Sequence, residues 1–474
     1  MGHRAGEDRE QSALFPLRLE ELVSEEAVVR VIDAWVASLD LQALGFSKAR
    51  AAATGRPPYH PGDLLKLYLY GYLNGVRSSR RLERECQRNV EVMWLLGRLA
   101  PDHKTVADFR RTQGAALIAA AAAFVQFARR HGLIGGQTVA VDGSKVRAVA
   151  SRKAVIGVRS LKQQDEAIEQ RLRQFMQEMD EADAQEGQAA SAQAVHQSLQ
   201  ALRQQQQQVR QQLQELEQAN RTTVVLSEPE ARKMKSLGGA PGYNLQTAVD
   251  THSHLIVHHE VVNEVSDQQQ LAPMALATAA VLETGELEVL ADAGYSSARQ
   301  LAELPEGIEA VLPIQRAVNP HDPHGVLFDR TDFPYDPHSD CYRCPAGQLL
   351  KRRSTNTRDA IWLYAPDKGV CPRCPQQAAC TSSDRRWVSR SHFEQALQAA
   401  QQRLDERPDA MAVRRQTAEH PFGTIKDHIL INARLLMRGM AGAKAELSLA
   451  VLAYNLKRAT NAKGVRWMVR TSAG

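Results

Sequence analysis

Two stretches with seven-residue periodicity, between residues 161 and 218, constrain the fold of this 474-residue chain more than any other feature. In both, apolar residues step by sevens, fours and threes, as on a helix that packs along a partner helix. The seam positions are Leu161, Ile168, Leu172, Phe175 and Met179 in the first stretch and Val195, Leu199, Leu202, Val209, Leu213 and Leu216 in the second. A small-residue segment, AQEGQAASAQ, separates them. We therefore predict an antiparallel coiled-coil hairpin over residues 159–221.

The regions on both sides of this hairpin have the patterns of a mixed α/β sheet. Before it, QTVAVDGSKVRAVA predicts a short strand that ends at Asp142, followed by a turn at Gly143. After it come two strands in GYNLQTAVDTHSHLIVHHEVV, a helix, an apolar strand that ends at Asp292, another helix and a last strand. This order predicts an α/β domain built from residues 131–158, 222–314 and 390–462, which the hairpin interrupts.

Helical spacing dominates residues 18–130, which follow a polar tail at residues 1–17. Within this all-α part, arginines recur at spacings of four, three and four, so a helix would place them on one face. They are Arg77, Arg81, Arg84 and Arg88. Two interpretations stay open for this stripe, a solvated charged face and a surface that contacts DNA. The first three arginines are our candidate DNA contacts.

Five of the six cysteines fall between residues 341 and 380, in a segment, residues 315–389, that is rich in Pro, Cys, Arg and Asp. Cys341-x2-Cys344 and Cys371-x2-Cys374 have the spacing of two knuckles that bind one tetrahedral Zn²⁺. We predict one structural zinc ion held by these four thiolates, with Cys380 as a substitute ligand. A regulatory dithiol pair is the alternative.

Three acids are candidate catalytic residues. Asp142 and Asp292 each end an apolar strand, where a side chain projects into the crevice of an open sheet, although either could simply cap the strand end. Glu419, in AEHPFGTIKD, lies beyond the cysteine segment. Three carboxylates can hold two Mg²⁺ ions about 4 Å apart for phosphoryl transfer.

Glu419 has a basic residue on each side of it at helical spacing. Arg415, Glu419 and Lys426 fall on one helical face, and the two bases would contact phosphates, unless the row is only a surface salt-bridge ladder. Pro421 lacks an N–H, so we expect a helix to begin or to kink there.

The bulk composition is that of a soluble protein, with 43% hydrophobic and 24% charged residues. No window approaches 18 consecutive apolar residues, and the start MGHRAGEDREQS lacks the apolar core of a signal peptide. We expect a cytoplasmic protein that contacts no membrane. The formal net charge of +5 is only a weak argument for a polyanionic partner.

Several ordered motifs resemble one protein family. VDGSK, LADAGYSS and the R-x3-E-x6-K spacing of Arg415, Glu419 and Lys426 resemble the active-site motifs of DDE transposases of bacterial insertion sequences. HPGDLLKLYLYGYLNGVRSSRRLE and PDHKTVADFRR resemble their helical N-terminal domain, and GYNLQTAVD and CPAGQLL resemble the group with a cysteine-bearing insertion. The resemblance covers roughly residues 15–460. One position departs from it: Ala412 stands where the family has a tyrosine, so a contact with the DNA strand near the cut is in doubt.

The resemblance implies a fold, an activity and partners. The fold would have a ribonuclease H-like core, and the activity would be cutting of DNA and joining of its 3′ ends with two Mg²⁺ ions at Asp142, Asp292 and Glu419. The partners would be double-stranded DNA, as transposon ends and target, and further copies of the chain on those ends. Two alternatives stay open, a nuclease that cuts without joining and a DNA-binding derivative that no longer catalyses.

Overall fold

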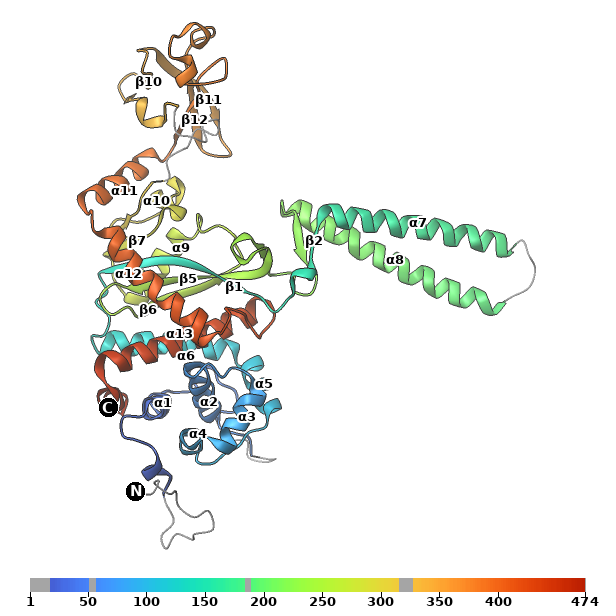
Figure 1. The fold of residues 1–474 in the computed structure, drawn as a ribbon, viewed down its shortest axis with the longest axis vertical. Coiled ribbons are helices and arrows are strands. Elements are labelled where there is room, and N and C mark those ends of the chain that lie inside the picture. The colour runs from blue at the N-terminus through green and yellow to red at the C-terminus, as the bar shows by residue number, and fades with distance from the viewer. Residues whose placement is uncertain (1–17, 51–56, 184–188, 315–326, 474) are drawn as a thin grey trace, which may run out of the picture.

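The computed structural model describes residues 18–50, 57–183, 189–314 and 327–473 (Figure 1). A helical N-terminal part, a central sheet and a small β-rich part follow one another along the longest axis, and a two-helix hairpin projects from the sheet to one side (Figure 1). Among the described residues, no helix is long and apolar enough to cross a membrane.

The central sheet is mixed and has six strands. They are β1 (Thr138–Arg147), β4 (Arg232–Met234), β5 (Ala240–Asp250), β6 (Ile256–Val262), β7 (Leu287–Leu290) and β8 (Ile308–Val311). β5 pairs antiparallel with β1, and both β6 and β4 pair antiparallel with the other edge of β5. On the other side of β1, β7 and then β8 run parallel to it. β1 is therefore at the centre of the sheet, with partners of opposite direction on its two edges.

Helices cover both faces of this sheet. Val139 and Val141 of β1 pack with α9 (Leu271–Leu282) on one face, whereas Leu245 and Val249 of β5 pack on the opposite face. That second face is covered by α6 (Gly114–Arg130) and α13 (Gly439–Lys463). The alternation follows from the two-residue period of a strand, which sends successive side chains to opposite faces.

The N-terminal helices share their core with the sheet. They are α1 (Val28–Ala37), α2 (Pro61–Leu73), α3 (Ser79–Arg88), α4 (Val90–Leu95) and α5 (His103–Thr112), followed by α6. One continuous apolar cluster runs from Trp35 in α1 through Phe124 in α6 to Leu452 in α13. α14 (Val465–Ala473) closes this cluster against α1. The helical part is therefore anchored on the sheet and is not joined to it by a free linker.

The projecting hairpin consists of α7 (Val158–Asp183) and α8 (Ala189–Gln218), which lie side by side (Figure 1). Five of the predicted seam residues are buried, and four of them, Leu161, Ile168, Val209 and Leu216, form one apolar cluster between the helices. At the root, β2 (Val155–Gly157) pairs antiparallel with β3 (Thr223–Val225), so the chain leaves the sheet and returns to it at one point.

The β-rich part has a core of its own. It is a five-stranded antiparallel sheet of β9 (Tyr335–Asp336), β10 (Cys341–Arg343), β11 (Leu349–Asn356), β12 (Ile361–Ala365) and β13 (Val388–Ser391). Its core contains Phe333, Tyr342, Leu350, Tyr364 and Val388. The chain then returns to the central sheet through α11 (Glu394–Glu406) and α12 (Ala410–Gly423), with α10 (Ala298–Ala302) packed against α11.

The prediction for the end of the first strand is wrong. β1 does not end at Asp142, because its antiparallel pairing with β5 continues from Asp142 opposite Thr247 as far as Arg147 opposite Gly242. Gly143 is accordingly inside a strand and not in a turn. Of the two alternatives at Pro421, a helix start is excluded, because α12 runs through Pro421 and continues into a π-helical segment, Thr424–Ile429.

Candidate active site

Asp142 lies in β1, and Asp292 lies two residues beyond the end of the neighbouring strand β7, at the same level. The parallel pairing of β1 with β7 ends with Ala140 opposite Leu290, and each aspartate lies two residues further along its strand direction. Since side chains two residues apart point to the same face of a strand, both carboxylates leave the sheet on the same side. Asp292 also accepts a hydrogen bond from the N–H of Gly294, at 2.8 Å, which fixes the turn after β7.

An arginine that sequence reasoning did not select lies between these two acids. Arg414 Nη2 is 2.9 Å from Asp142 Oδ1 and 3.5 Å from Asp292 Oδ2. Its side chain is only 12% exposed. Nε and Nη2 nevertheless have no well-directed hydrogen bond among the described residues, so the contact is an ion pair in which the N–H bonds are poorly aimed. The guanidinium is thus the positive group that lies between the two carboxylates.

The packing of α12 explains why Arg414 reaches the acids. Ala410, one turn before it, is buried against Leu290 of β7 and Val311 of β8. Residues four apart lie on the same helical face, so a helix whose Ala410 lies on the end of β7 carries Arg414 over the adjoining acids. Arg415 points elsewhere and is exposed.

The electrostatics of Asp142 are unusual for an aspartate. Burial raises its pKa to about 6, against the opposing effects of Arg414 and of the Gly143 N–H, while Asp292 and Asp267 raise it further. The positive charge of Arg414 therefore does not fully offset the burial of the Asp142 carboxylate. A divalent cation beside this carboxylate would supply further positive charge and favour the ionised form.

Asp267 is a third aspartate near Asp142, and the sequence analysis missed it. Its Oδ1 accepts hydrogen bonds from Lys145 Nζ at 2.9 Å, Asn244 Nδ2 at 2.7 Å and Gln246 Nε2 at 2.6 Å. A Cβ on Gly143 would lie 2.5 Å from this same Oδ1, so glycine is required for Asp267 to approach β1. Asp267 follows no predicted strand, so no pattern in the sequence marked it.

Glu419 is not brought into contact with the two strand aspartates. It is exposed on α12, and no hydrogen bond or ion pair involves its side chain in the part of the chain that the structure describes. Lys426, by contrast, is half-buried in the π-helical segment. Burial lowers the pKa of Lys426, against the attraction of Asp142, and Lys145 lowers it further. Of Arg415, Glu419 and Lys426, the residues of the predicted R-x3-E-x6-K motif, Lys426 is therefore the one whose charge interacts with Asp142.

The residues fit a divalent cation in part. Two carboxylates converge on one cationic group, which is the donor chemistry that Mg²⁺ requires. However, the described residues contain no group of three or more His, Cys, Asp or Glu side chains placed to hold a metal ion. Asp142 and Asp292 can thus supply ligands as they stand, whereas Glu419 would have to approach them.

The predicted DNA contacts of the helical part separate into two kinds. Arg77 is not on the surface: it precedes α3, is only 8% exposed, and pairs with Glu446 of α13 at 2.9 Å. Its Nη1 also donates to the carbonyl of Arg434 at 2.8 Å. The prediction for Arg77 is wrong, because the helix begins two residues later and the side chain turns inward. Arg81 and Arg84 are exposed on α3.

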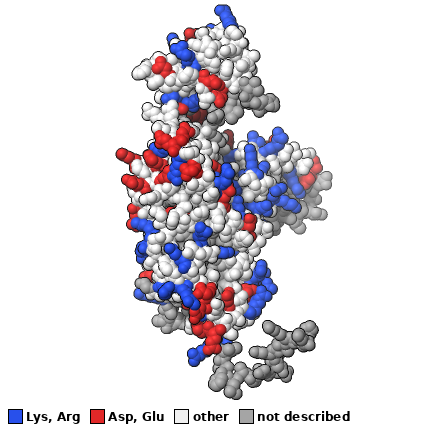
Figure 2. Space-filling model, turned by 60° about the vertical axis from the view of Figure 1, so that its left-hand side comes forward, with Lys and Arg blue, Asp and Glu red and all other residues white. Residues whose placement is uncertain are grey.

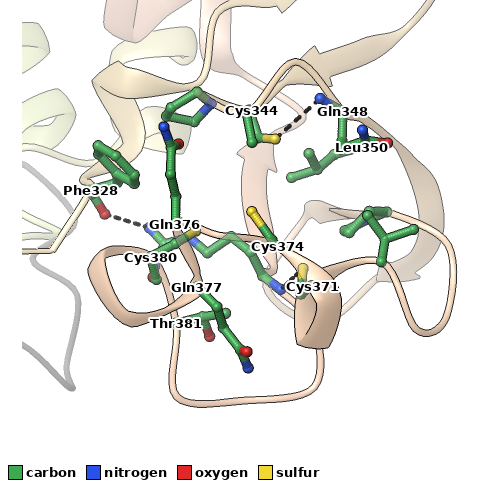
Figure 3. A pocket seen from close by; sticks show the side chains of 15 residues that line it. Phe328, Cys344, Gln348, Leu350, Cys371, Cys374, Gln376, Gln377, Cys380 and Thr381 are labelled. Carbon is green, nitrogen blue, oxygen red and sulfur yellow. Dashed lines mark hydrogen bonds between the residues drawn. The ribbon is translucent and has the colours of Figure 1, made fainter.

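Four cysteines lie around one pocket in the β-rich part, but they are not the four that were predicted (Figure 3). They are Cys344, Cys371, Cys374 and Cys380. The Sγ of Cys344 accepts the N–H of Gln348 at 3.3 Å, and that of Cys371 accepts the N–H of Arg386 at 3.4 Å.

Cys341 does not belong to this group. It is buried in β10, and its Sγ is 2.8 Å from Ser339 Oγ. Burial raises the pKa of Cys380, and negative charge on Cys371, Cys344 and Cys374 would raise it further. The four-cysteine set that contains Cys341 is therefore not supported.

Comparison with known proteins identifies the family. Residues 219–456 match the family model described as "Transposase DDE domain", which spans half of the chain, and residues 17–112 match the one described as "Transposase domain (DUF772)". The chain belongs to the DDE transposase family. No curated protein matches it. A solved structure, the cryo-EM structure of piggyBac transposase synaptic complex with hairpin DNA (SNHP), is similar over 94% of this chain and 76% of that chain, with 8% identity and a TM-score of 0.33. At that score the likeness carries no argument.

Proposed function

We propose that this DDE transposase binds the ends of its mobile element, cuts DNA there and joins the 3′ ends to a target. The observation that carries the proposal is the placement of Asp142 in β1 and of Asp292 just beyond the neighbouring strand β7 at one level, around a single cationic group. The match to the transposase DDE family model supports it. Acids fixed on buried strands or at their ends are held rigidly, as a site for phosphoryl transfer requires.

The strand order supports a ribonuclease H-like core. Along the sheet the order is β6-β5-β1-β7-β8, so the first three strands of this series in the chain are antiparallel neighbours and the last two are added in parallel to β1. The hairpin, residues 159–221, and the cysteine segment, residues 315–389, would be insertions in this core, the first of them a coiled coil. The helical residues 18–130 would be the DNA-binding domain.

The chain's own residues would divide the work at the site. Asp142 and Asp292 would hold Mg²⁺, which, when bound, activates the attacking oxygen and neutralises the leaving oxygen. Arg414 would give up its place between the carboxylates and become available to a phosphate. Lys426, already close to Asp142, would contact the same phosphate, and exposed Arg415 would hold the strand further away. Glu419 would complete the ligand set when DNA brings α12 closer.

We also propose a structural zinc site with revised ligands, Cys344, Cys371, Cys374 and Cys380. As they stand, these described side chains are not placed to hold a metal ion, so they would have to move closer together around it. Two arguments support it: the four side chains line one pocket, and backbone N–H groups already donate to two of the sulfurs. Such donors favour the thiolate form that binds zinc.

A specific observation also favours a second candidate, a DNA-binding derivative without catalysis. Glu419 is apart from both aspartates, and Ala412 replaces the tyrosine of the family motif. Incubation of the full chain with Mg²⁺ and DNA that carries the repeats flanking its gene separates the candidates. Joined products would support the transposase, and cut products without joining would support a nuclease. A shifted band in a gel, without any cutting, would support the inactive DNA-binding derivative.

A further inference from the structure

The root of the hairpin is surrounded by exposed basic residues, which we call the hairpin collar. They come from the end of β1, the first turns of α7 and the segment around β4. Its members are Arg147, Arg152, Lys153, Arg159, Lys162, Lys233 and Lys235. None of these residues was selected by the sequence analysis, and none belongs to the candidate active site.

Strand pairing brings the collar together from separate parts of the chain. Arg147 of β1 and Arg232 of β4 are both register partners of Gly242 in β5, which lies between these two strands. The two arginines are therefore at the same level of the sheet. A Cβ on Gly238 would lie 3.0 Å from Arg152 Nη2, and one on Gly239 would lie 3.4 Å from Lys233 Cε. The 3₁₀ turn Arg152–Ala154 and the segment after β4 are therefore in contact.

The collar residues have no acidic ion-pair partners: Asp165 and Glu166 follow Lys162 by three and four residues on α7, but Asp165 pairs with Arg210 of α8 at 2.9 Å. Residues 143–164 contain no Asp or Glu. In residues 219–240 the acids are Glu228 and Glu230. Glu228 is buried and accepts from Tyr243 Oη and from the N–H of Ala150, both at 2.9 Å, while Glu230 accepts the N–H of Met440 at 2.6 Å. No collar residue forms an ion pair within the described part of the chain.

Two further cations lie beneath this surface. Burial lowers the pKa of half-buried Arg232, and the positive charge of Arg221 lowers it further, against the opposing effects of Glu264 and Glu230. Like charges that outnumber the acids near them create a positive potential, which attracts a polyanion. Figure 2 shows many Lys and Arg, with few Asp and Glu among them, over the part that projects to the right.

The collar is connected to the candidate active site by a single strand. Asp142 and Arg147 are five residues apart on β1, a distance of roughly 17 Å at 3.4 Å per residue. The N–H of Arg147 donates to the carbonyl of Ala433 at 2.8 Å, just beyond the segment that carries Lys426. One base pair also rises about 3.4 Å, so the same distance along a duplex is roughly five base pairs.

We infer that the hairpin collar binds the phosphate backbone of the DNA duplex, about five base pairs away from the bond that is cut. This inference rests on the proposed function, because it takes the acids as the point of cutting. Lysine and arginine side chains are common donors to phosphate oxygens, and contacts of this kind fix the path of the duplex without reading its sequence.

The experiment measures binding of the full chain to a labelled random-sequence 40-base-pair duplex as a function of salt. The collar variant carries Arg152→Gln, Lys153→Gln, Lys233→Gln and Lys235→Gln. A control with the same change of charge carries Lys351→Gln, Arg358→Gln, Lys368→Gln and Arg373→Gln, which are exposed positions in the β-rich part. Equal melting temperatures of the two variants would show that folding is unchanged.

The collar variant should lower the slope of log K against log salt by about 3.6, at about 0.9 for each of four lost phosphate contacts, and weaken binding at least tenfold. The control should change binding less than about twofold. An unchanged slope in the collar variant, or an equal loss in the control, would overturn the inference. Equal displacement of the duplex by RNA of the same length would overturn the assignment to duplex DNA.

The footprint and the cutting assay separate this inference from the proposed function. On DNA cut by the wild-type protein, the collar variant should lose backbone protection about five base pairs from the cut, and unchanged protection there would refute the inference. The wild-type protein could fail to cut DNA while the collar variant still binds the duplex more weakly and with a smaller salt slope. The proposed function would then fail, but the collar would remain a surface that binds DNA. If the wild-type protein cuts and the variant binds normally, the collar inference alone fails.

Discussion

Arg414 and Asp142 form an ion pair, 2.9 Å from Nη2 to Oδ1, at the point where the parallel pairing of β1 with β7 ends. The same nitrogen is 3.5 Å from Asp292, so one guanidinium serves both carboxylates. A bound cation would compete with it for these oxygens. The position of this arginine therefore links metal binding to the orientation of α12.

The first prediction concerns this competition. Arg414→Gln should bind Mn²⁺, measured by electron paramagnetic resonance, at least several-fold more tightly than wild type, because no guanidinium has to be displaced. Arg415→Gln, at the exposed neighbouring position, should leave Mn²⁺ affinity unchanged. Weaker binding by Arg414→Gln would instead mean that the arginine holds the carboxylates in place for the metal.

The second prediction concerns pH. Asp142 has a pKa raised from 3.8 to about 6, so the folded protein holds this proton more tightly than the unfolded chain. Above pH 6 the ionised form destabilises the fold, by on the order of 3 kcal/mol for a shift of about two units. In chelator, Asp142→Asn should melt at a higher temperature than wild type at pH 7.

The pH dependence supplies the control for this prediction. The advantage of Asp142→Asn should shrink as the pH falls from 6 toward 3.8 and vanish below it, where Asp142 is protonated in both the folded and the unfolded state. Asp384→Asn, at an exposed position, controls for the loss of one charge. A difference in melting temperature that is independent of pH would contradict the raised pKa.

The third prediction distinguishes the two cysteine sets. Cys380→Ser should lose zinc, measured by elemental analysis of reduced protein, because Cys380 lines the pocket with Cys344, Cys371 and Cys374. Cys341→Ser should retain about one zinc ion per chain, since its sulfur lies beside Ser339. The reverse result would restore the set expected from spacing, and zinc-free wild-type protein would remove the site altogether.

The fourth prediction separates Arg77 from the arginines of α3. Arg77→Ala should destabilise the fold by roughly 3–5 kcal/mol in urea unfolding, because Glu446 would be left buried and unpaired. The double variant Arg81→Gln, Arg84→Gln should unfold within about 0.5 kcal/mol of wild type but bind DNA more weakly and with a smaller salt slope. Unchanged DNA binding by the double variant would make α3 a solvated face.

The sequence predicted the secondary-structure elements better than the tertiary contacts between them. Asp292 follows its strand as expected because the three apolar residues of β7 and the small-residue turn after it mark the end of the strand locally. The end of β1 was misplaced because its last five residues are held by β5, about a hundred residues away in the chain. Local alternation cannot report such a partner.

The candidate site shows the same limit. Motif spacing selects Arg415, but Arg414 reaches the acids, since the rotation of α12 is set by Ala410 against Leu290 and Val311. Helical spacing placed Arg77 in the basic stripe, yet the helix begins at Ser79 and a buried glutamate from α13 takes the side chain. Both outcomes depend on tertiary packing, which periodicity alone does not contain.

The most direct test of the account measures DNA cutting and 3′-end joining, in Mg²⁺, by Asp142→Asn, Asp292→Asn and Glu419→Gln. Asp250→Asn is the matched control, because Asp250 accepts hydrogen bonds from Gly136 and Ser253 and only fixes a turn. We predict that the first three lose roughly three or more orders of magnitude in rate, with DNA affinity within about threefold of wild type, and that Asp250→Asn stays active. Cutting by Asp142→Asn or Asp292→Asn at a rate near that of wild type would contradict the assignment of the active site.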